Sequence, residues 1–184
     1  KLNNNVLRNV YYLYLSDIQG SENLALDYLR LCYKYGIDIN LAKNNETIIL
    51  VDKYCKRVSG EAHSFTGFVR FKEIGPLSYY SVIEPDHNIL PIILRHFTNR
   101  FSDQNFIIHD LKREKAIVYN TKEAIITDLT KEQGEKLSNK IDDSDFENLW
   151  RTFYNSVNIE ERKNHKCRNQ HMPRRYWKHL TELQ

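Results

Sequence analysis

The spacing of apolar residues changes twice along this 184-residue chain, and that change constrains the fold more than any other feature. Residues 6–63 place apolar side chains three or four positions apart, which is the spacing of one helix face. Residues 64–128 contain short β-branched and aromatic runs separated by turn residues, which is typical of strands. Helical spacing returns from residue 129. We therefore predict one α+β domain over 1–184, in which helices from both ends flank a sheet.

Three helices are predicted in the first third of the chain. The first covers residues 6–15, and the second is capped by Ser21 and ended by Gly36. The third runs from about Glu46 to His63 and carries a continuous apolar face made of Ile48, Val51, Cys55, Val58 and Ala62.

The central segment predicts an antiparallel sheet of ββαββ order. The turn residues Gly75 and Pro76 separate the first two strands, and a helix with a strong apolar stripe separates two hairpins. Alternation along the first strand places Phe68, Arg70 and Lys72 on one face, where they would form a base-stacking platform or a cross-strand core contact. The predicted elements are strands 65–71 and 77–84, helix 88–101, strands 105–110 and 115–120, and a further short strand at 123–128.

The last third predicts three more helices. They cover residues 131–141, residues 145–157, and a short helix that starts at Pro173. In the second of them, Leu149, Phe153 and Val157 would face a core.

Positive charge is concentrated at the C-terminal end. Residues 151–184 hold eight Lys or Arg against three acids, a net +5, whereas the whole chain carries +3. Such a segment either binds phosphates or is only a solvated tail. Because arginine forks and aromatic rings occur together, we predict a nucleic-acid-binding surface formed by Arg70, Arg162, Arg168, Arg174, Arg175, Tyr176 and Lys178.

Acidic and imidazole side chains lie near the ends of the predicted strands, where sites are often built. They could perform general acid–base chemistry if they converge, although Asp86 serves equally well as a helix cap. No nucleophile elbow, phosphate-binding loop or dinucleotide motif is present in the sequence, so no cofactor is predicted. The spacing of His165, Cys167 and His171 does not fit a zinc site, so no metal is predicted either. The candidate catalytic residues are Glu61, His63, His87, His109 and Asp110.

The three cysteines are widely spaced and odd in number, which favours reduced thiols and a cytoplasmic protein. The sequence contains neither a signal peptide nor an apolar run long enough to cross a membrane, so no membrane association is expected. The chain opens at Lys1 without a methionine, and we expect it to lack its native N-terminal segment.

Several segments together resemble a bacterial family of DNA metabolism or DNA repair proteins. These segments are EAHSFTGFVRF (61–71), YYSVIEPDHNILPIILRHFTNRF (79–101), FIIHDLKR (106–113), LWRTFYNSVNIEERKN (149–164) and QHMPRRYW (170–177). Members of that family are described as accompanying a radical-SAM protein, and a similar domain occurs fused to uracil-DNA-glycosylase-like proteins. The resemblance implies a role with DNA but supplies no catalytic residues.

Three hypotheses follow for the function. The first is a DNA-associated binding or accessory module that uses the basic C-terminal segment. The second is an enzyme acting on nucleic acid through the His/Asp/Glu candidates. The third is a protein-interaction partner of the radical-SAM protein, with little affinity for nucleic acid. Salt-dependent binding separates the first from the third.

Overall fold

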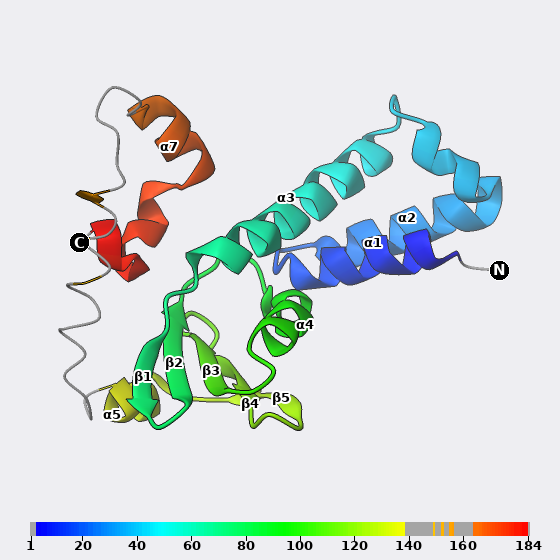
Figure 1. The fold of residues 1–184 in the computed structure, drawn as a ribbon. Helices are drawn as coiled ribbons and strands as arrows, with labels where there is room; N and C mark the ends of the chain where they lie inside the picture. The colour runs from blue at the N-terminus through cyan, green and yellow to red at the C-terminus, as the bar shows by residue number, and fades with distance from the viewer. Residues whose placement is uncertain (1–2, 139–148, 150–151, 153–154, 157–163, 184) are drawn as a thin grey trace. The chain divides into compact units, whose positions relative to one another are not determined.

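The computed structural model describes residues 3–138, 149, 152, 155–156 and 164–183 (Figure 1). The chain divides into two compact units. Unit 1 comprises residues 1–63 together with 86–89, and unit 2 comprises residues 64–85 together with 90–184. Among the described helices, none combines the length and the apolar character needed to span a membrane.

Unit 1 is helical, as predicted. It contains α1 (Asn4–Leu15), α2 (Ser21–Tyr35), the 3-10 helix η1 (Ile37–Leu41) and most of α3 (Glu46–Phe68). Ser21 does not cap α2, because Gly20 occupies the N-cap with φ +84° and Ser21 is already helical. Gly36 ends α2 as expected, since its φ of +75° is a conformation that glycine adopts without strain.

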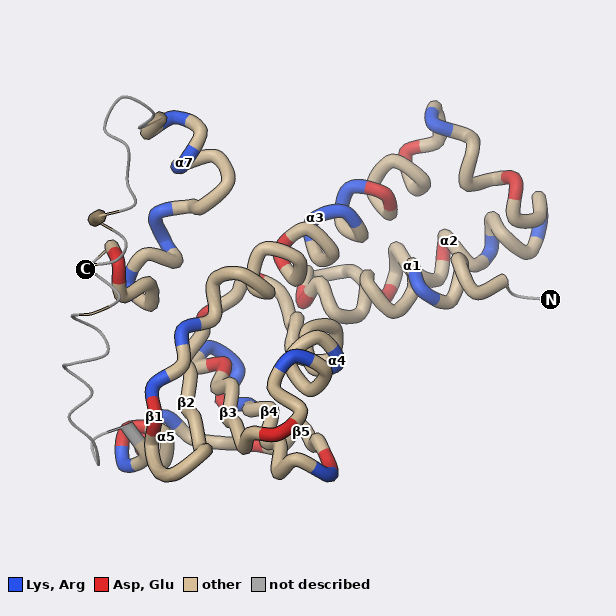
Figure 2. Tube along the Cα trace, in the orientation of Figure 1, with Lys and Arg blue, Asp and Glu red and all other residues tan. Residues whose placement is uncertain are grey.

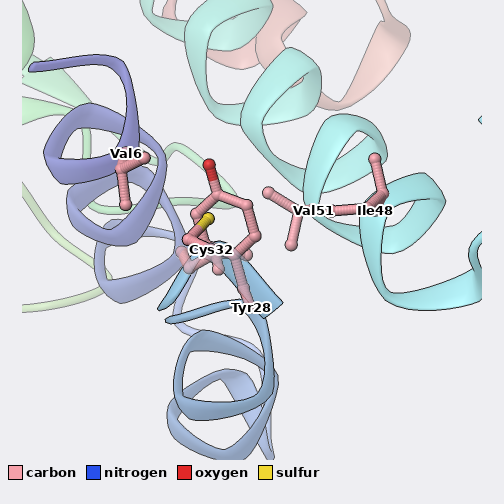
Figure 3. Packing of buried hydrophobic residues seen from close by; sticks show 6 residues of the cluster. Val6, Tyr28, Cys32, Ile48 and Val51 are labelled. Carbon is pink, nitrogen blue, oxygen red and sulfur yellow. The ribbon is translucent and has the colours of Figure 1, made fainter. Parts of the chain in front are cut away.

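The core of unit 1 gathers side chains from α1, α2 and α3, as Figure 3 shows for Val6, Tyr28, Cys32, Ile48 and Val51. The hydroxyl of the fully buried Tyr28 accepts a hydrogen bond from Asn9 Nδ2 (3.0 Å) and donates to Asn40 Oδ1 (2.8 Å). Burial raises the pKa of Tyr28 to about 12, although both amides lower it. The phenol therefore stays neutral and joins α2 to α1 and η1 by hydrogen bonds, while its ring packs in the apolar core.

The predicted strand at 65–71 is wrong, because α3 continues through this segment to Phe68. Phe65 lies three residues after Ala62 and seven after Val58, and all three side chains are buried. The helical period therefore persists despite the β-favouring composition, and Gly67 does not end the helix. The proposed platform of Phe68, Arg70 and Lys72 does not form, since the first of these is helical and the last begins β1.

Unit 2 contains one sheet of five strands in the order β1-β2-β3-β4-β5. The predicted α+β class and the strand–strand–helix–strand–strand order are confirmed. β2 and β3, however, are parallel, whereas the other three neighbouring pairs are antiparallel. Helix α4 (Leu90–Arg100) supplies the crossover that parallel neighbours require. The strands are β1 (Lys72–Gly75), β2 (Ser78–Ile83), β3 (Asn105–Asp110), β4 (Lys115–Tyr119) and β5 (Ala124–Asp128).

An aromatic cluster joins the sheet to α4. The ring of Phe71 lies 5.1 Å from Phe101 and 5.8 Å from both Phe97 and Phe106, with edge-to-face geometry throughout. Phe106 in turn lies 5.1 Å from Tyr119 on β4. Such pairs add specific geometry to the burial of large apolar surfaces, so this cluster fixes how α4 packs on its face of the sheet.

The helices predicted after the sheet are only partly confirmed. The first is α5 (Lys131–Ser138), and the rest of its predicted range lies outside the described residues. Most of the predicted helix at 145–157 lies outside the described residues, and Leu149, predicted to face a core, is exposed. The helix predicted from Pro173 consists instead of the 3-10 helices η3 (Arg174–His179) and η4 (Thr181–Leu183), and α7 (His165–His171), which precedes them, was not predicted.

Candidate nucleic-acid interface

Helices α7 and η3 carry the basic C-terminal segment within unit 2. The side chain of Asn164 caps α7 by accepting a hydrogen bond from the Cys167 backbone N–H at 2.9 Å. Pro173, predicted to be the first helical residue, is instead the N-cap of η3, which begins one position later at Arg174. Figure 2 shows the Lys and Arg residues that follow one another along these helices.

Two buried side chains anchor this segment. The ring of Tyr176 packs edge-to-face on Phe65 at 4.9 Å and also lies 5.9 Å from Phe68, both near the end of α3. Leu180 is completely buried. Since only 4% of Tyr176 is exposed, its ring holds η3 in place, and it offers no free face for a base. Aromatic surface on α3 thus determines where the basic residues lie.

Arginines stack on the aromatic rings of η3. The guanidinium carbons of Arg168 and Arg174 lie 4.7 and 5.6 Å from the centre of the Trp177 ring. Arg175 covers the Tyr176 ring at 4.7 Å and donates a hydrogen bond to its hydroxyl at 2.9 Å. Trp177 is itself held by a 2.9 Å hydrogen bond from its indole N–H to the Met172 carbonyl. Stacking on the Trp177 and Tyr176 rings therefore fixes the positions of these three guanidinium groups.

Two other predicted cations form ion pairs with carboxylates. Arg70 donates to both oxygens of Glu182, from Nε at 3.1 Å and from Nη2 at 2.5 Å, and the Glu182 side chain is only 4% exposed. Lys178 donates to Glu84 on the chain that leaves β2, at 2.5 Å. These two pairs tie the basic segment to the rest of unit 2, so their cations act chiefly in positioning it.

The imidazole of His179 also lies beside Glu84, with its Nε2 atom 3.3 Å from the carboxylate. Burial alone would raise the pKa of Glu84, but Lys178 and His179 outweigh it and hold that pKa below its usual value. Burial lowers the pKa of His179, although Glu84 opposes the shift. This end of η3 is thus held by an ionised carboxylate. Arg162, the remaining predicted cation, lies outside the described residues.

Among the acid–base candidates of unit 1, Glu61 binds the loop that contains His87. The two carboxylate oxygens of Glu61 accept hydrogen bonds from the backbone N–H groups of Asp86 (2.7 Å) and His87 (2.9 Å). Glu61 therefore fastens residues 86–89 to α3, which also carries His63. The structure brings Glu61 to the backbone of His87. A catalytic role for these three residues stays a prediction.

In unit 2, His109 is fully buried on β3 and both ring nitrogens are engaged. Nε2 lies 2.8 Å from the Leu129 carbonyl, which only accepts, so this nitrogen carries the proton. Nδ1 consequently accepts the hydroxyl proton of Tyr80 at 2.7 Å. Burial lowers the pKa of His109, against the opposing effects of Leu129, Asp110 and Glu114, and the neutral ring fits both bonds.

Asp110 follows His109 but has separate partners. Its carboxylate accepts from the backbone N–H groups of Lys112 and Arg113 and from the Arg113 guanidinium at 2.9 Å. Burial raises the pKa of Asp110, although Arg113 counteracts the shift. Arg113 also donates to the Pro85 carbonyl, so Asp110 organises the turn between β3 and β4. The pair predicted as neighbours thus performs two distinct structural tasks.

The remaining chemical features of the described residues are few. A hollow of about 160 Å³ lies beside Tyr80 and is also lined by Val82, Leu111, Lys131, Gly134 and Glu135. No cluster of three His, Cys, Asp or Glu side chains able to hold a metal occurs in the described part of the chain. All three cysteines are free thiols.

Sequence reasoning missed the residues that position the interface. Glu84 and Glu182 fix the basic segment, yet each is an isolated acid whose partner lies far away in the sequence. Trp177 is not among the predicted surface residues, yet it orders two arginines. Arg168 lies nine residues before Trp177 in the sequence, so the three- or four-residue spacing of a helix face does not relate the two residues.

Comparison with known proteins gives one family. No curated protein and no solved structure matches the chain. A family model described as a domain of unknown function, DUF4130, matches residues 19–182. This match includes the sheet, both buried anchors of η3 and the arginines stacked on Trp177. The chain therefore belongs to the DUF4130 family.

Proposed function

We propose that this protein is a nucleic-acid-binding module that acts on DNA as an accessory subunit. One observation carries the proposal. Arg168 and Arg174 both stack on Trp177, and no ion pair joins either of them to a carboxylate among the described residues. Lys166 and Arg174 are exposed on the same short segment. The segment therefore combines an aromatic platform with two arginines that no described carboxylate pairs.

This combination suits a single strand or a phosphate beside an unstacked base. A guanidinium that already lies on a ring has lost much of its rotamer freedom, so binding costs less conformational entropy. The exposed Arg174 presents its N–H fork to phosphate oxygens, whereas Arg168 is partly buried and its Nη2 lies 3.2 Å from His165 Nδ1. The half-buried Trp177 ring offers stacking to a base that displaces one arginine, worth about 1–3 kcal/mol per base.

The proposal is tested by measuring how affinity depends on salt. A fluorescent single-stranded oligonucleotide and a matched duplex are titrated with the protein at several salt concentrations. Log affinity should fall linearly with log salt. Replacing Arg168 and Arg174 together by alanine should lower the single-strand slope by about 0.7 for each phosphate that is no longer neutralised. Replacing both by lysine should keep the slope but weaken binding, since lysine lacks the planar fork.

A matched control removes two exposed arginines elsewhere in unit 2. Arg95 and Arg100 lie on α4, and both are exposed. The double alanine variant at these positions has the same net charge as the test variant and should retain the wild-type slope. An equal reduction of the slope in both variants would mean that only overall charge matters. Absence of binding to either oligonucleotide at low salt would refute the proposed function.

The accessory role rests on the resemblance to DNA-repair proteins that accompany a radical-SAM protein. We expect the tagged protein to retain that radical-SAM protein in a pull-down after nuclease treatment. Retention together with salt-dependent DNA binding supports an accessory module. Retention without any DNA binding would instead favour the alternative of a pure interaction subunit.

A further inference from the structure

The two edges of the sheet in unit 2 are protected differently. The edge strand β1 is short, carries Lys72 and Glu73, and has an irregular register between Glu73 and Gly75. These are devices that block pairing with another strand. β5 forms the opposite edge with a regular register along its whole length. It has no proline, and Ile125 is 56% and Ile126 38% exposed. β5 is therefore an open edge.

The hydrogen-bond pattern shows which groups of β5 point outward. The Glu123 carbonyl accepts from Asn120, and the Leu129 N–H donates to Glu114. Because inward-bonding residues alternate along an antiparallel strand, residues 125 and 127 also bond to β4. Ala124, Ile126 and Asp128 consequently turn their N–H and C=O groups away from the sheet. No described segment pairs with them.

We propose that this edge binds the β5 edge of a second copy of the chain, antiparallel and two-fold symmetric about Ile125. In this register Ala124 faces Ile126 of the partner, and the two residues exchange backbone hydrogen bonds on both sides of the axis. Ile125 meets its own counterpart in a close pair without backbone hydrogen bonds. The two sheets then form one continuous sheet.

Charge complementarity selects this register. It brings Lys122, which lies in the turn two residues before β5, to the side of Asp128 of the other copy, and the symmetry repeats that pair of side chains. Asp128 already lies 3.9 Å from Lys115 on its inner side, so cation, anion and cation would follow one another across the strands. Moving the axis by one residue to Ile126 would instead face Asp128 with Ala124, and neither ion pair could form.

Apolar residues favour the same register. Ile107, Val118 and Ile125 are aligned across β3, β4 and β5. A two-fold axis at Ile125 continues this row into the Ile125, Val118 and Ile107 of the second copy. Cross-strand pairs of β-branched residues stabilise sheets, and opposite charges placed directly across add to this. An isologous contact of this kind closes as a dimer, because β1 is a guarded edge.

The test uses charge reversal and mixing. Sedimentation over a range of concentrations should show that the wild-type protein dimerises. Lys122→Asp and Asp128→Lys should each weaken the dimer by about tenfold or more, because each variant alone faces like charges twice. Mixed in equal amounts, the two variants should form a heterodimer with both pairs restored. Lys56→Asp, at an exposed position of α3, is the control and should dimerise like the wild type.

The mixing step separates a folding defect from a disrupted interface, since misfolded chains would not rescue each other. Cross-linking then tests the axis. In a Cys167→Ser background, Ile125→Cys should form an intermolecular disulfide under mild oxidation, because the two Cα atoms would lie about 4.5 Å apart. Thr127→Cys should not. A monomeric wild-type protein, failure of the mixture to dimerise, or equal cross-linking at both positions would overturn the proposal.

Discussion

Gly134 decides whether α5 can lie on the sheet. It is buried in the second turn of α5. A Cβ atom there would lie 2.5 Å from both the Tyr80 hydroxyl and His109 Nδ1. A buried hydrogen bond joins the Tyr80 hydroxyl to His109 Nδ1, so neither atom can move away without breaking it. The glycine thus allows a close approach that no larger residue permits.

We therefore expect Gly134→Ala to destabilise the protein by about 1–3 kcal/mol, the usual cost of overpacking. Alanine would otherwise favour the helix by about 1 kcal/mol. Gly60→Ala in α3 is the matched control, because a Cβ there meets nothing within 4 Å. That change should be neutral or stabilising. Urea denaturation of both variants measures the difference, and a stabilising Gly134→Ala would contradict the packing described.

His109 and His179 should make stability depend on pH. Burial lowers the pKa of each imidazole. In the unfolded chain a histidine takes up a proton near pH 6.5, whereas these two stay neutral further down when folded. Stability should therefore be complete above pH 6.5 and decline as the pH falls below it. Urea midpoints between pH 8 and 5.5 should show this fall.

The substitution His109→Gln isolates the contribution of His109. It should reduce the dependence of stability on pH and leave only the part of that dependence that comes from His179. Midpoints that rise on acidification would show that the folded imidazoles are charged rather than neutral.

At the scale of elements, one ion pair fastens the C-terminal helices. Arg70 follows α3, and its fork meets the nearly buried Glu182 in η4. Removing Arg70 would leave that carboxylate without its bidentate partner in a dry site. Since breaking a buried pair is far more costly than breaking an exposed one, Arg70→Met should destabilise η3 and η4 by roughly 2–4 kcal/mol.

Limited trypsin digestion measures this effect locally. Cleavage after Arg174, Arg175 and Lys178 should become faster in Arg70→Met than in the wild type. The double variant Arg70→Met/Glu182→Leu should recover part of the protection, because no unpaired charge remains. Lys115→Met is a control, since its pair with Asp128 is exposed and contributes little. Equal cleavage rates in all variants would show that the pair does not hold the segment.

Most of the helices and strands could be predicted from the sequence. The helices of unit 1, the α4 stripe with Leu90 and Phe97, and the strands β2 to β5 follow directly from apolar spacing. The segment 65–68 did not, because Phe65 and Phe68 fit a strand by composition and a helix by period. Only its packing with Tyr176, more than a hundred residues away, decides between them.

The same limit applies to the candidate interface. The clustering of cations near the C-terminus was evident from the sequence, and it supplied the residues of the proposed surface. Which of these cations are already paired was not evident, because Glu84 and Glu182 meet Lys178 and Arg70 only through the fold. The engagement of both nitrogens of His109 likewise depends on Leu129, from a different part of unit 2.

At the scale of the whole molecule, the two units have separate cores. The cluster around Val6, Leu13 and Tyr28 contains only side chains of unit 1. Ile108 and Ile117 are fully buried in the sheet of unit 2. Helix α3 nonetheless belongs to both units. Each core should therefore respond to its own substitutions, although the chain crosses between the units within α3 and on both sides of residues 86–89.

Hydrogen exchange followed by mass spectrometry tests this separation. Leu13→Ala should destabilise unit 1 by about 2–5 kcal/mol and accelerate exchange in α1 and α2, with little change in β3 and β4. Ile117→Ala should produce the reverse pattern. Faster exchange throughout the chain in either variant would show that the two units unfold as one cooperative body.

The pairing of Arg70 with Glu182 has a consequence for biosynthesis, since 112 residues separate the two partners. A ribosome adding about 5–20 residues per second needs roughly 6–22 s to travel that distance. Until Glu182 emerges, the nascent chain must expose the Arg70 cation and the rings of Phe65 and Phe68 that Tyr176 later covers. The end of α3 is thus a surface that chaperones can reach while translation continues.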